Sequence, residues 1–330
     1  MKALWYTGTN TMELREAPEP TRGNGDVVLR IDAVGICGSD MHAYHGYDPR
    51  RVPPMILGHE FAATVVDGPG VGRRVTGNPL VTCGRCEFCV QGRNNLCADR
   101  TMIGMSRPGA YAERMAIPAG CLIDLPATLD TVHAALTEPA ATALHALNLS
   151  MRALARPLPE CSTLVLGGGA IGMLAALLCR SYGVRGLAVA ETNPLRRDSV
   201  ARAVGCATFD PASRGGPRDG SVDFVIDAVG SKATRQAALA AVKPGGVVMH
   251  IGLQDWASEI DMRRLTLAEI TLIGTYTYTT ADLRAAVDAL AGGAFGDLAW
   301  VEERPLAEGA TAFADLDAGR TAASKIVLRP

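Results

Sequence analysis

The distribution of apolar residues divides the chain into two regions of different texture. In residues 1–80, short apolar runs such as Asp26–Ile31 and Phe61–Val66 alternate with Gly, Pro and polar residues. Short runs rich in Val and Ile, separated by turn residues, are typical of antiparallel or barrel-like sheets. The first region is therefore predicted to be a β-domain.

From about residue 140, strand-like and helix-like segments alternate instead. The strand-like runs are 163–166, 187–190, 222–226, 247–251 and 271–273. One helical segment follows the first run and ends at residue 182, and two others cover 194–205 and 231–242. This alternation predicts a parallel sheet covered by helices on both faces. A polar loop is predicted over residues 211–220, and the mixed region from residue 281 ends in a strand-like run at 325–329.

Length, charge and hydropathy limit the classes of protein to which this chain can belong. A chain of 330 residues exceeds the size at which one core usually stops growing, so two domains are expected. With 32 Lys and Arg against 34 Asp and Glu, charge-driven binding to nucleic acid or to a membrane surface is not expected. The longest uncharged run, 161–179, carries adjacent glycines and does not resemble a membrane span. Because the N-terminus lacks an apolar leader, we expect a cytoplasmic protein.

A glycine motif follows the first strand of the alternating region. Gly167, Gly169 and Gly172 fit the pattern G-x-G-x-x-G and open an apolar helix. The first glycine permits a tight turn, the second lets a pyrophosphate approach the backbone, and the third lets helix and strand pack closely. The free N–H groups at the start of the helix then bind phosphate. The motif predicts a dinucleotide site.

An acidic residue ends the next predicted strand. Glu191 lies 19 residues after Gly172, where a carboxylate accepts hydrogen bonds from the adenosine ribose. The same charge repels a 2′-phosphate, so NAD(H) is favoured over NADP(H). The nearby Arg196 and Arg197 leave NADP(H) open as the less favoured cofactor.

Four cysteines, Cys83, Cys86, Cys89 and Cys97, form the pattern C-x2-C-x2-C-x7-C. In a reducing compartment, clustered thiols favour a metal ion over disulfides. Four thiolates complete a tetrahedron and leave no open position, which indicates a structural zinc. A redox role for one C-x2-C pair is the alternative. The surrounding lobe, 83–97, has little apolar content of its own.

A looser group of candidate ligands lies in the first region. Cys37 and His59 fall on predicted loops and could bind a second zinc together with a carboxylate from Glu60 or Glu138. Buried cysteines and hydrogen-bonded histidines are common without a metal, so spacing alone leaves this site open.

In combination, these motifs resemble the zinc-containing medium-chain alcohol dehydrogenases, especially the branch of sorbitol (polyol) and threonine dehydrogenases. The matching stretches are the glycine turn and residues 35–42, 58–60, 83–97, 109–113, 137–145, 227–230 and 325–330. The resemblance implies an α/β protein with a GroES-like β-barrel-type catalytic domain and a Rossmann coenzyme domain. The catalytic domain would comprise residues 1–146 and 279–330, with residues 147–278 as the inserted Rossmann domain and the active site in the cleft.

The resemblance also implies roles for individual residues around a catalytic zinc. Cys37, His59 and Glu60 would hold the metal, and Glu138 would be a further ligand or a hydrogen-bond partner of the zinc-bound water. Asp40 would orient a ligand imidazole. The proton-relay residues would be Ser39 and His42. The adenosine contacts would be Ile171, Glu191 and Arg196, and the nicotinamide loops would contain Ile251, Gly252, Leu253, Thr275 and Tyr276.

The implied activity is hydride transfer between NAD(H) and a secondary alcohol, with a polyol or sugar alcohol as the favoured substrate. The alternatives are an amino-alcohol dehydrogenase of the threonine type, or a non-catalytic dinucleotide-binding relative that has lost its metal. The resemblance further implies two zinc ions per chain and a homodimer or homotetramer. Because Ala43 and Tyr44 change the substrate-side wall, substrate identity does not transfer from the family.

Overall fold

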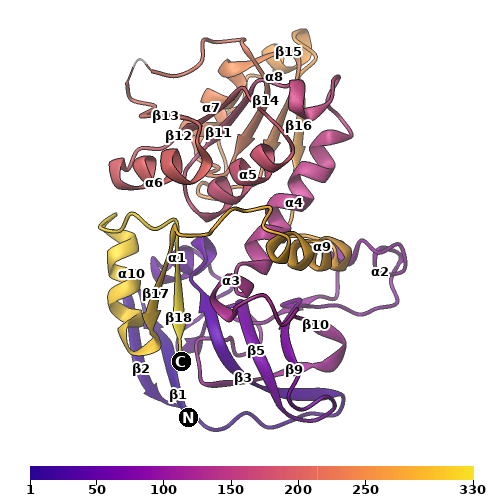
Figure 1. Cartoon of the computed structure of the whole chain (residues 1–330), viewed down its shortest axis with the longest axis vertical. Coiled ribbons are helices and arrows are strands. Elements are labelled where there is room, and N and C mark those ends of the chain that lie inside the picture. The colour runs from indigo at the N-terminus through magenta and orange to yellow at the C-terminus, as the bar shows by residue number, and fades with distance from the viewer. Residues whose placement is uncertain (214) are drawn as a thin grey trace.

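A computed structural model describes the chain except for residue 214, which lies in the loop predicted over residues 211–220. The molecule has a β-rich half and an α/β half, stacked one above the other in Figure 1. Between them run two long helices, α4 (Thr137–Met151) and α9 (Thr280–Ala291).

The β-rich half is built on a mainly antiparallel sheet with the strand order β10-β6-β5-β3-β18-β17, with β9 also paired to β3. The strands are β3 (Asp26–Gly35), β5 (Glu60–Asp67), β6 (Arg74–Gly77), β9 (Arg114–Pro118), β10 (Leu122–Asp124), β17 (Val301–Pro305) and β18 (Lys325–Arg329). The last two come from the far end of the chain, and β18 pairs antiparallel with β3 through Leu328 and Val34. This arrangement confirms the predicted β-domain and the strand at 325–329.

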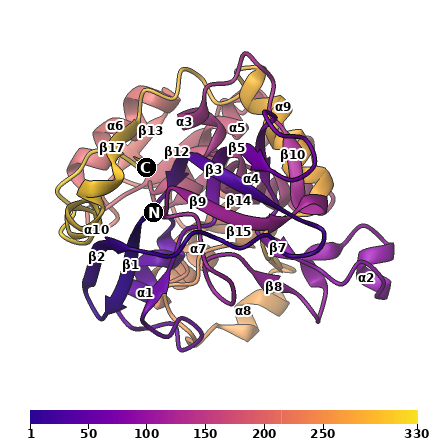
Figure 2. The same ribbon diagram turned by 90° about the horizontal axis from the view of Figure 1, so that it is seen from below.

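Smaller elements complete this half. The strands β1 (Lys2–Gly8), β2 (Thr11–Glu16) and β4 (Met55–Ile56) form a separate antiparallel sheet, and β7 (Leu80–Val81) pairs with β8 (Thr101–Met102). The short helices are α1 (Gly38–Tyr44), α2 (Glu87–Val90), α3 (Thr131–Ala134) and α10 (Gly309–Asp317). Seen from below in Figure 2, the segment carrying α2 projects from the side of the molecule.

The α/β half contains a parallel sheet in the order β13-β12-β11-β14-β15-β16. Its strands are β11 (Thr163–Leu166), β12 (Leu187–Ala190), β13 (Ala207–Phe209), β14 (Val222–Asp227), β15 (Val242–His250) and β16 (Thr271–Gly274). Its helices are α5 (Ala170–Ser181), α6 (Pro194–Val204), α7 (Lys232–Ala241) and α8 (Met262–Leu267). The strand order reverses next to β11, which places a ligand crevice at the carboxyl ends of β11 and β14.

The alternating pattern predicted most elements of this half, but it missed the short strand β13 and the short helix α8, and it shifted one boundary. Strand β15 begins at Val242 rather than at residue 247, because Val242 already pairs with Val222 across a bulge. The predicted helices at 194–205 and 231–242 match α6 and α7 within a residue.

Helices α4 and α9 pack against each other and share one hydrophobic cluster with strands of the α/β half. His145 and Asn148 on α4 both contact the Asp282 carboxylate on α9, at 2.8 and 2.9 Å. The predicted domain boundary at residues 146 and 147 falls inside α4, and the domain division stays a prediction.

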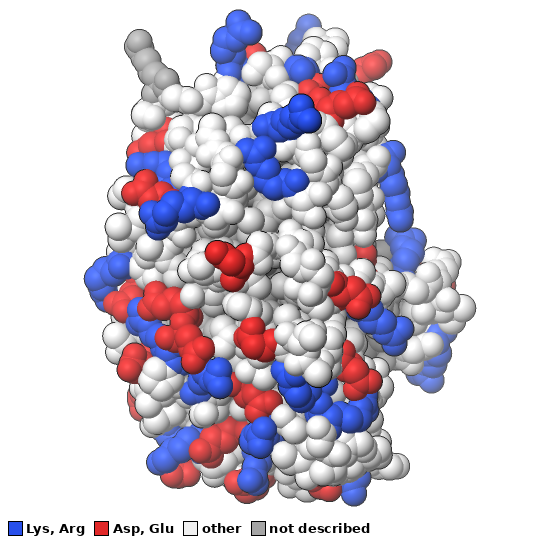
Figure 3. Space-filling model, viewed as in Figure 1, with Lys and Arg blue, Asp and Glu red and all other residues white. Residues whose placement is uncertain are grey.

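The surface carries no single-sign charge field on the face shown in Figure 3, where basic and acidic side chains are interspersed. In the described part of the chain, no helix is both long enough and apolar enough to cross a membrane.

Candidate active site

Cys37 stands at the start of a short helix. It is the N-cap of α1, where its Sγ accepts the N–H of Ser39 and its own N–H donates to the Asp40 carboxylate at 3.2 Å. This reciprocal capping starts the helix directly after β3. The structure thereby corrects the loop predicted here, because Ser39 and His42 lie on α1.

His59 and Glu60 enter the site at the start of β5. The preceding Gly58 has φ +94°, and a Cβ on it would lie 2.8 Å from the Tyr111 ring, so the turn requires glycine. One donor atom each from Cys37, His59 and Glu60 lies within 4.8 Å of the others. A thiol, an imidazole and a carboxylate converging in a buried place match the ligand types of zinc.

Asp40 lies behind the histidine of this set. Its Oδ2 accepts the Tyr111 hydroxyl at 2.7 Å, while Oδ1 faces His59 Nδ1 at 3.6 Å. Both facing atoms are buried, and among the described residues neither has a hydrogen-bond partner. A carboxylate behind a ligand imidazole is the arrangement that fixes a histidine for metal binding.

Glu60 forms a buried ion pair that the sequence did not reveal. Both of its carboxylate oxygens accept from Lys325 Nζ, at 2.8 and 2.6 Å, and the same ammonium donates to the Ile36 carbonyl at 2.7 Å. Neither side chain is exposed beyond 1%. Any metal bound here therefore shares the Glu60 carboxylate with Lys325, and the role of Glu60 as a ligand stays a prediction.

Glu138 lies beside this set in the first turn of α4. Its Oε1 accepts the Tyr278 hydroxyl at 2.9 Å, and it does not belong to the group of three whose donor atoms lie within 4.8 Å. Burial raises the pKa of Glu138 to about 7, against the opposing effect of His59. This placement favours Glu138 as a neighbour of the metal position over Glu138 as a direct ligand.

The electrostatics of Cys37 support a metal. Burial raises the pKa of its thiol far above the ordinary value, and the Glu60 carboxylate raises it further. A thiolate at this position therefore needs a compensating positive charge, which a divalent ion supplies. The donor set thus fits a zinc ion.

The predicted relay residues lie next to Cys37 on α1. Ser39 Oγ donates to Cys37 Sγ at 3.4 Å, and His42 follows three residues later on the same helix face. Burial lowers the pKa of the half-buried His42, and the neighbouring His45 lowers it further, so the imidazole is neutral near pH 7 and able to accept a proton.

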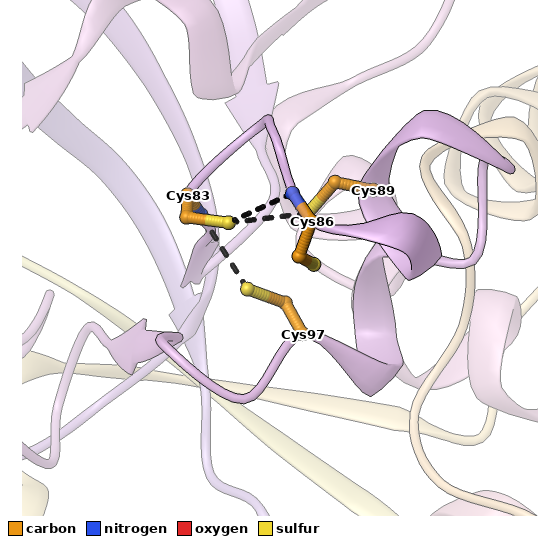
Figure 4. Close-up of side chains that lie close together, drawn as sticks. All are labelled: Cys83, Cys86, Cys89 and Cys97. Atoms are coloured by element: carbon orange, nitrogen blue, oxygen red, sulfur yellow. Dashed lines mark hydrogen bonds between the residues drawn. The ribbon is translucent and has the colours of Figure 1, made fainter.

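The four lobe cysteines turn inward to a common point (Figure 4). Cys83 Sγ accepts the N–H of Cys86 at 3.4 Å and lies 4.0 Å from Cys89 Sγ, while Cys97 Sγ accepts the N–H of Cys83. Backbone N–H groups of Arg85 and Cys86 lower the pKa of Cys83 to about 6. Convergence of four sulfur atoms favours a structural zinc over a redox pair.

The lobe is tied to the loop after β16. Asn95 Nδ2 donates to the Tyr276 carbonyl at 2.8 Å, and the Thr280 N–H donates to Asn94 Oδ1 at 3.1 Å. The Arg100 guanidinium lies 4.8 Å above the Tyr276 ring. The loop that contains the predicted nicotinamide residues is thus anchored on the lobe.

The glycine turn has the geometry that its motif predicts. Gly167 has φ +97°, and a Cβ on Gly172 would collide with the carbonyl oxygen of Gly167. Around the position of a Cβ on Gly169 there is open space, and Gly169, the N-cap of α5, has no side-chain oxygen to occupy the first N–H groups of the helix. The first N–H groups of α5 are therefore available to an anion.

Glu191 is bound to the glycine turn itself. Its carboxylate accepts the N–H of Gly168 and of Asn193, both at 2.7 Å, and lies 3.5 Å from the Arg196 guanidinium. Ser324, just before β18, donates to the Gly168 carbonyl at 2.7 Å and links the turn to the β-rich half. Glu191 and Arg196 thus lie together at the carboxyl end of β12, while Ile171 lies on the first turn of α5.

The remaining predicted cofactor residues follow β15 and β16. The N–H groups of Ile251 and Gly252 donate to the Asp227 carbonyl at 2.9 and 3.0 Å, whereas Leu253 points outward and is exposed. Thr275 donates its N–H to the His250 carbonyl, and its hydroxyl is buried with no partner in the part of the chain that the structure describes. These loops lie at the same edge of the parallel sheet as the glycine turn.

Sequence reasoning missed three polar residues around the site. Lys325 and Tyr278 contact predicted ligands, and Arg51 contacts Ser39. A lysine inside the apolar run 325–329 was the available signal for the first, because an inward-facing charge in a strand needs a buried partner. Arg51 and Tyr278 lie in irregular segments, where no periodicity reveals burial.

Comparison with known proteins agrees with this geometry. A family model described as the alcohol dehydrogenase GroES-like domain matches residues 23–127, and one described as zinc-binding dehydrogenase matches residues 170–292. The chain is 31% identical to 2-dehydro-3-deoxy-L-galactonate 5-dehydrogenase of Pseudoalteromonas atlantica, over 96% of this chain and 95% of that protein. It is also 31% identical to L-threonine 3-dehydrogenase of Shewanella frigidimarina, over 79% and 80% of the two chains.

A solved structure extends the likeness to the whole fold. A protein of Sinorhizobium meliloti 1021, described as a zinc-binding dehydrogenase and bound to NADP, superposes with a TM-score of 0.86. The two chains are 32% identical, and the match covers 100% of this chain and 99% of the other. These findings confirm the predicted fold class and the resemblance on which it depended. The chain belongs to the zinc-dependent medium-chain alcohol dehydrogenase family.

Proposed function

We propose that this protein oxidises a secondary alcohol of a polyol or sugar alcohol, with NAD⁺ as the hydride acceptor and a zinc ion at Cys37, His59 and Glu60. The observation that carries the proposal is the convergence of these three donor atoms within 4.8 Å, with His59 and Glu60 buried and Cys37 partly buried. When bound, the zinc ion polarises the alcohol oxygen and the dinucleotide takes up the hydride.

The chain's own residues orient the groups and move the proton. Asp40, held by Tyr111, keeps the His59 imidazole aimed at the metal position. Ser39 takes the proton from the alcohol oxygen and passes its own toward His42, from which it reaches solvent. The neutral His42 imidazole has a free lone pair for that proton.

A second zinc ion at Cys83, Cys86, Cys89 and Cys97 would be structural. Its role is to hold the lobe that anchors the Tyr276 loop through Asn95. Two zinc ions per chain are therefore expected.

For the dinucleotide, we infer NAD(H) over NADP(H). The buried Glu191 carboxylate at the end of β12 is suited to a ribose diol and repels a 2′-phosphate. Against this stands the NADP bound to the S. meliloti relative, and Arg196 near Glu191 offers a positive charge. Steady-state kinetics with both cofactors distinguish the two outcomes.

The names of the relatives favour two substrate classes. One relative is named for a sugar acid oxidised at carbon 5, which supports a polyhydroxylated substrate. The other is named for L-threonine, which keeps a hydroxy-amino acid as the second candidate. Both names denote a secondary hydroxyl.

The test is a substrate panel with matched metal analysis. Activity with sugar alcohols and sugar acids, compared with L-threonine and with long apolar alcohols, identifies the class. Cys37→Ala should abolish turnover and reduce the zinc content from two ions to one, while NADH binding persists. The matched control is Cys206→Ala, which removes a thiol outside both clusters. Full activity of Cys37→Ala, or a clear preference for long apolar alcohols, would overturn the proposal.

We further propose that the protein is a homodimer or homotetramer. The exposed large apolar side chains include Leu253, Trp256, Met262, Leu267 and Leu272, which lie in the segment from the end of β15 to β16. An exposed apolar segment at the edge of a parallel sheet supports association. Light scattering after size-exclusion chromatography measures the state directly, and a monomer at micromolar concentration would contradict it.

A further inference from the structure

Arg51 is a buried cation in the segment between α1 and β4, and it is only 3% exposed. Its charge partner is Asp48, whose Oδ2 accepts from Nη1 at 2.9 Å. Burying an arginine costs free energy unless its N–H donors have acceptors. The other acceptors of Arg51 therefore indicate its role.

Those contacts centre on Ser39. Nη1 donates to the Ser39 carbonyl at 3.1 Å, Nη2 donates to Ser39 Oγ at 3.2 Å, and Nε donates to the Gly104 carbonyl at 3.3 Å. The planar fork of the guanidinium thus holds both the backbone and the hydroxyl of one residue. A lysine carries its donors on one nitrogen and lacks the planar fork with which two separate nitrogens reach these two atoms.

This contact determines what the Ser39 hydroxyl can do. A guanidinium has no acceptor and stays charged, so Arg51 must be the donor and Ser39 Oγ the acceptor. A hydroxyl has two lone pairs and one proton. With one lone pair committed to Arg51, Oγ keeps one proton and one lone pair, and the proton points to Cys37 Sγ at 3.4 Å.

We propose that Arg51 is the positioning residue of the proton path, because it leaves the Ser39 hydroxyl able to accept one proton and to release one. This inference rests on the proposed function. In the oxidation, the O–H bond of the alcohol breaks and its proton goes to the free lone pair of Ser39 Oγ. The original Ser39 proton, which faces Cys37 Sγ in the structure, turns away from the sulfur and leaves by the relay proposed for His42, so Ser39 is neutral before and after. The adjacent positive charge opposes any arrangement in which Oγ keeps both protons.

A purely structural role for Arg51 is the competing explanation, because its bonds to the Ser39 and Gly104 carbonyls also anchor the backbone. The two explanations differ in one respect. A positioning residue acts through the Ser39 hydroxyl and has nothing left to act on when that hydroxyl is removed. A backbone anchor matters whether or not the hydroxyl is present.

The experiment is a double-mutant cycle on the zinc-loaded enzyme with its best alcohol. The variants are Arg51→Met, Ser39→Ala and the pair combined. The matched control is Arg50→Met, since Arg50 also pairs with Asp48, at 2.8 and 2.9 Å, but is 61% exposed and bonds to no Ser39 atom in the described part of the chain. Each variant is measured for kcat, KM, NADH affinity, zinc content and Tm.

We expect Ser39→Ala to lower kcat on the order of 100-fold and Arg51→Met about 10-fold or more, since a positioned proton-transfer group contributes on that scale. In the Ser39→Ala background, Arg51→Met should lower kcat by less than about 3-fold. KM, NADH affinity and zinc content should stay near those of the parent, and Arg50→Met should leave kcat unchanged. Free guanidinium should restore part of kcat to Arg51→Ala, and none to the same variant lacking the Ser39 hydroxyl.

Equal losses from Arg51→Met in both backgrounds would overturn the inference in favour of a backbone anchor. So would a parental kcat in Arg51→Met. If Arg51→Met does not fold, Arg51→Lys carries the same test, because the charge remains while the fork is lost. If Ser39→Ala itself keeps full kcat, the proposed proton path fails, and that failure is separate from a failure of Arg51 alone.

Discussion

At the scale of single residues, the candidate site depends on charges that are buried in pairs. Lys325 faces Glu60, Arg51 faces Asp48, and Glu191 accepts the N–H of Gly168 in the glycine turn. Glu60 and Glu191 are predicted functional positions, and Arg51 contacts a third, Ser39. Removing a partner should therefore cost stability as well as function, and paired variants can separate the two effects.

In the metal-free protein, Lys325→Met should leave the Glu60 carboxylate buried without a counter-charge. Breaking a buried pair in this way costs about 3–5 kcal/mol in the free energy of unfolding. The loss can be measured by urea denaturation. Lys2→Met is the control, because Lys2 pairs with Glu16 on an exposed surface and its removal should change little. The combination of Lys325→Met with Glu60→Gln should recover stability, and equal stability of Lys325→Met and the parent would contradict the importance of the pair.

Glu191→Ala should weaken NADH binding by roughly 10- to 100-fold, the scale of a lost hydrogen bond to a charged group. It should also reduce the ratio by which the protein binds NADH more tightly than NADPH. Because the carboxylate also accepts two backbone N–H groups, a lower Tm is expected. Glu191→Gln keeps an acceptor but not the charge, so it should restore part of the Tm without restoring discrimination. Fluorescence titration with both reduced cofactors measures this, with Asp198→Asn on the exposed face of α6 as control. An unchanged cofactor preference in Glu191→Ala would show that Glu191 does not determine the choice between NADH and NADPH.

At the scale of elements, the lobe around α2 is the part with the least core of its own. None of the α2 residues is buried, and the segment projects from the molecule in Figure 2. Its order must come from the cysteine cluster and from its bonds to the Tyr276 loop.

Cys89→Ser should therefore remove one zinc ion and loosen the lobe, because metal binding supplies the folding free energy of such segments. Since the Tyr276 loop is anchored there, KM for NAD⁺ should rise while the catalytic zinc remains. Metal analysis, limited proteolysis at residues 83–97 and kinetics report the three effects, with Cys206→Ser as control. A variant that melts and resists proteolysis like the parent would show that the lobe does not depend on metal.

The elements also show what the sequence could and could not predict. The parallel-sheet strands and the glycine turn were predictable because period, length and turn residues are local properties. Helix α1 was not, because its start depends on a cysteine N-cap, an unusual residue for that position. The Glu60–Lys325 pair joins residues 265 positions apart, and no local pattern connects them. The roles assigned to individual site residues also stay predictions, because no local pattern of the sequence determines them.

At the scale of the whole molecule, the two halves are joined by α4 and α9, where Asp282 is the central polar contact. Burial raises the pKa of Asp282, but hydrogen bonds from His145 and Thr279 more than offset this and lower it to about 2. A carboxyl whose pKa is lower in the folded state stabilises the fold above its unfolded pKa near 4. That contribution is lost as the pH falls from about 4 toward 2.

Asp282→Asn should lower the free energy of unfolding by roughly 2 kcal/mol at neutral pH. The difference between variant and parent should shrink as the pH falls through 4, because the parent then loses the same contribution. Urea denaturation between pH 7 and pH 3 measures both. Asp297→Asn, in the exposed loop after α9, is the control. A difference that stays constant with pH would contradict the ionic origin of the effect.

The return of the chain to its first sheet has a consequence for biosynthesis. Val327 pairs with Gly35. This edge of β3 therefore stays unpaired while the ribosome synthesises the whole α/β half. Until β18 arrives, that edge can pair with a neighbouring nascent chain, and Glu60 has no ammonium to neutralise it. Contacts so distant along the chain also form slowly. The interval before β18 pairs with β3 is therefore when the protein most needs a chaperone.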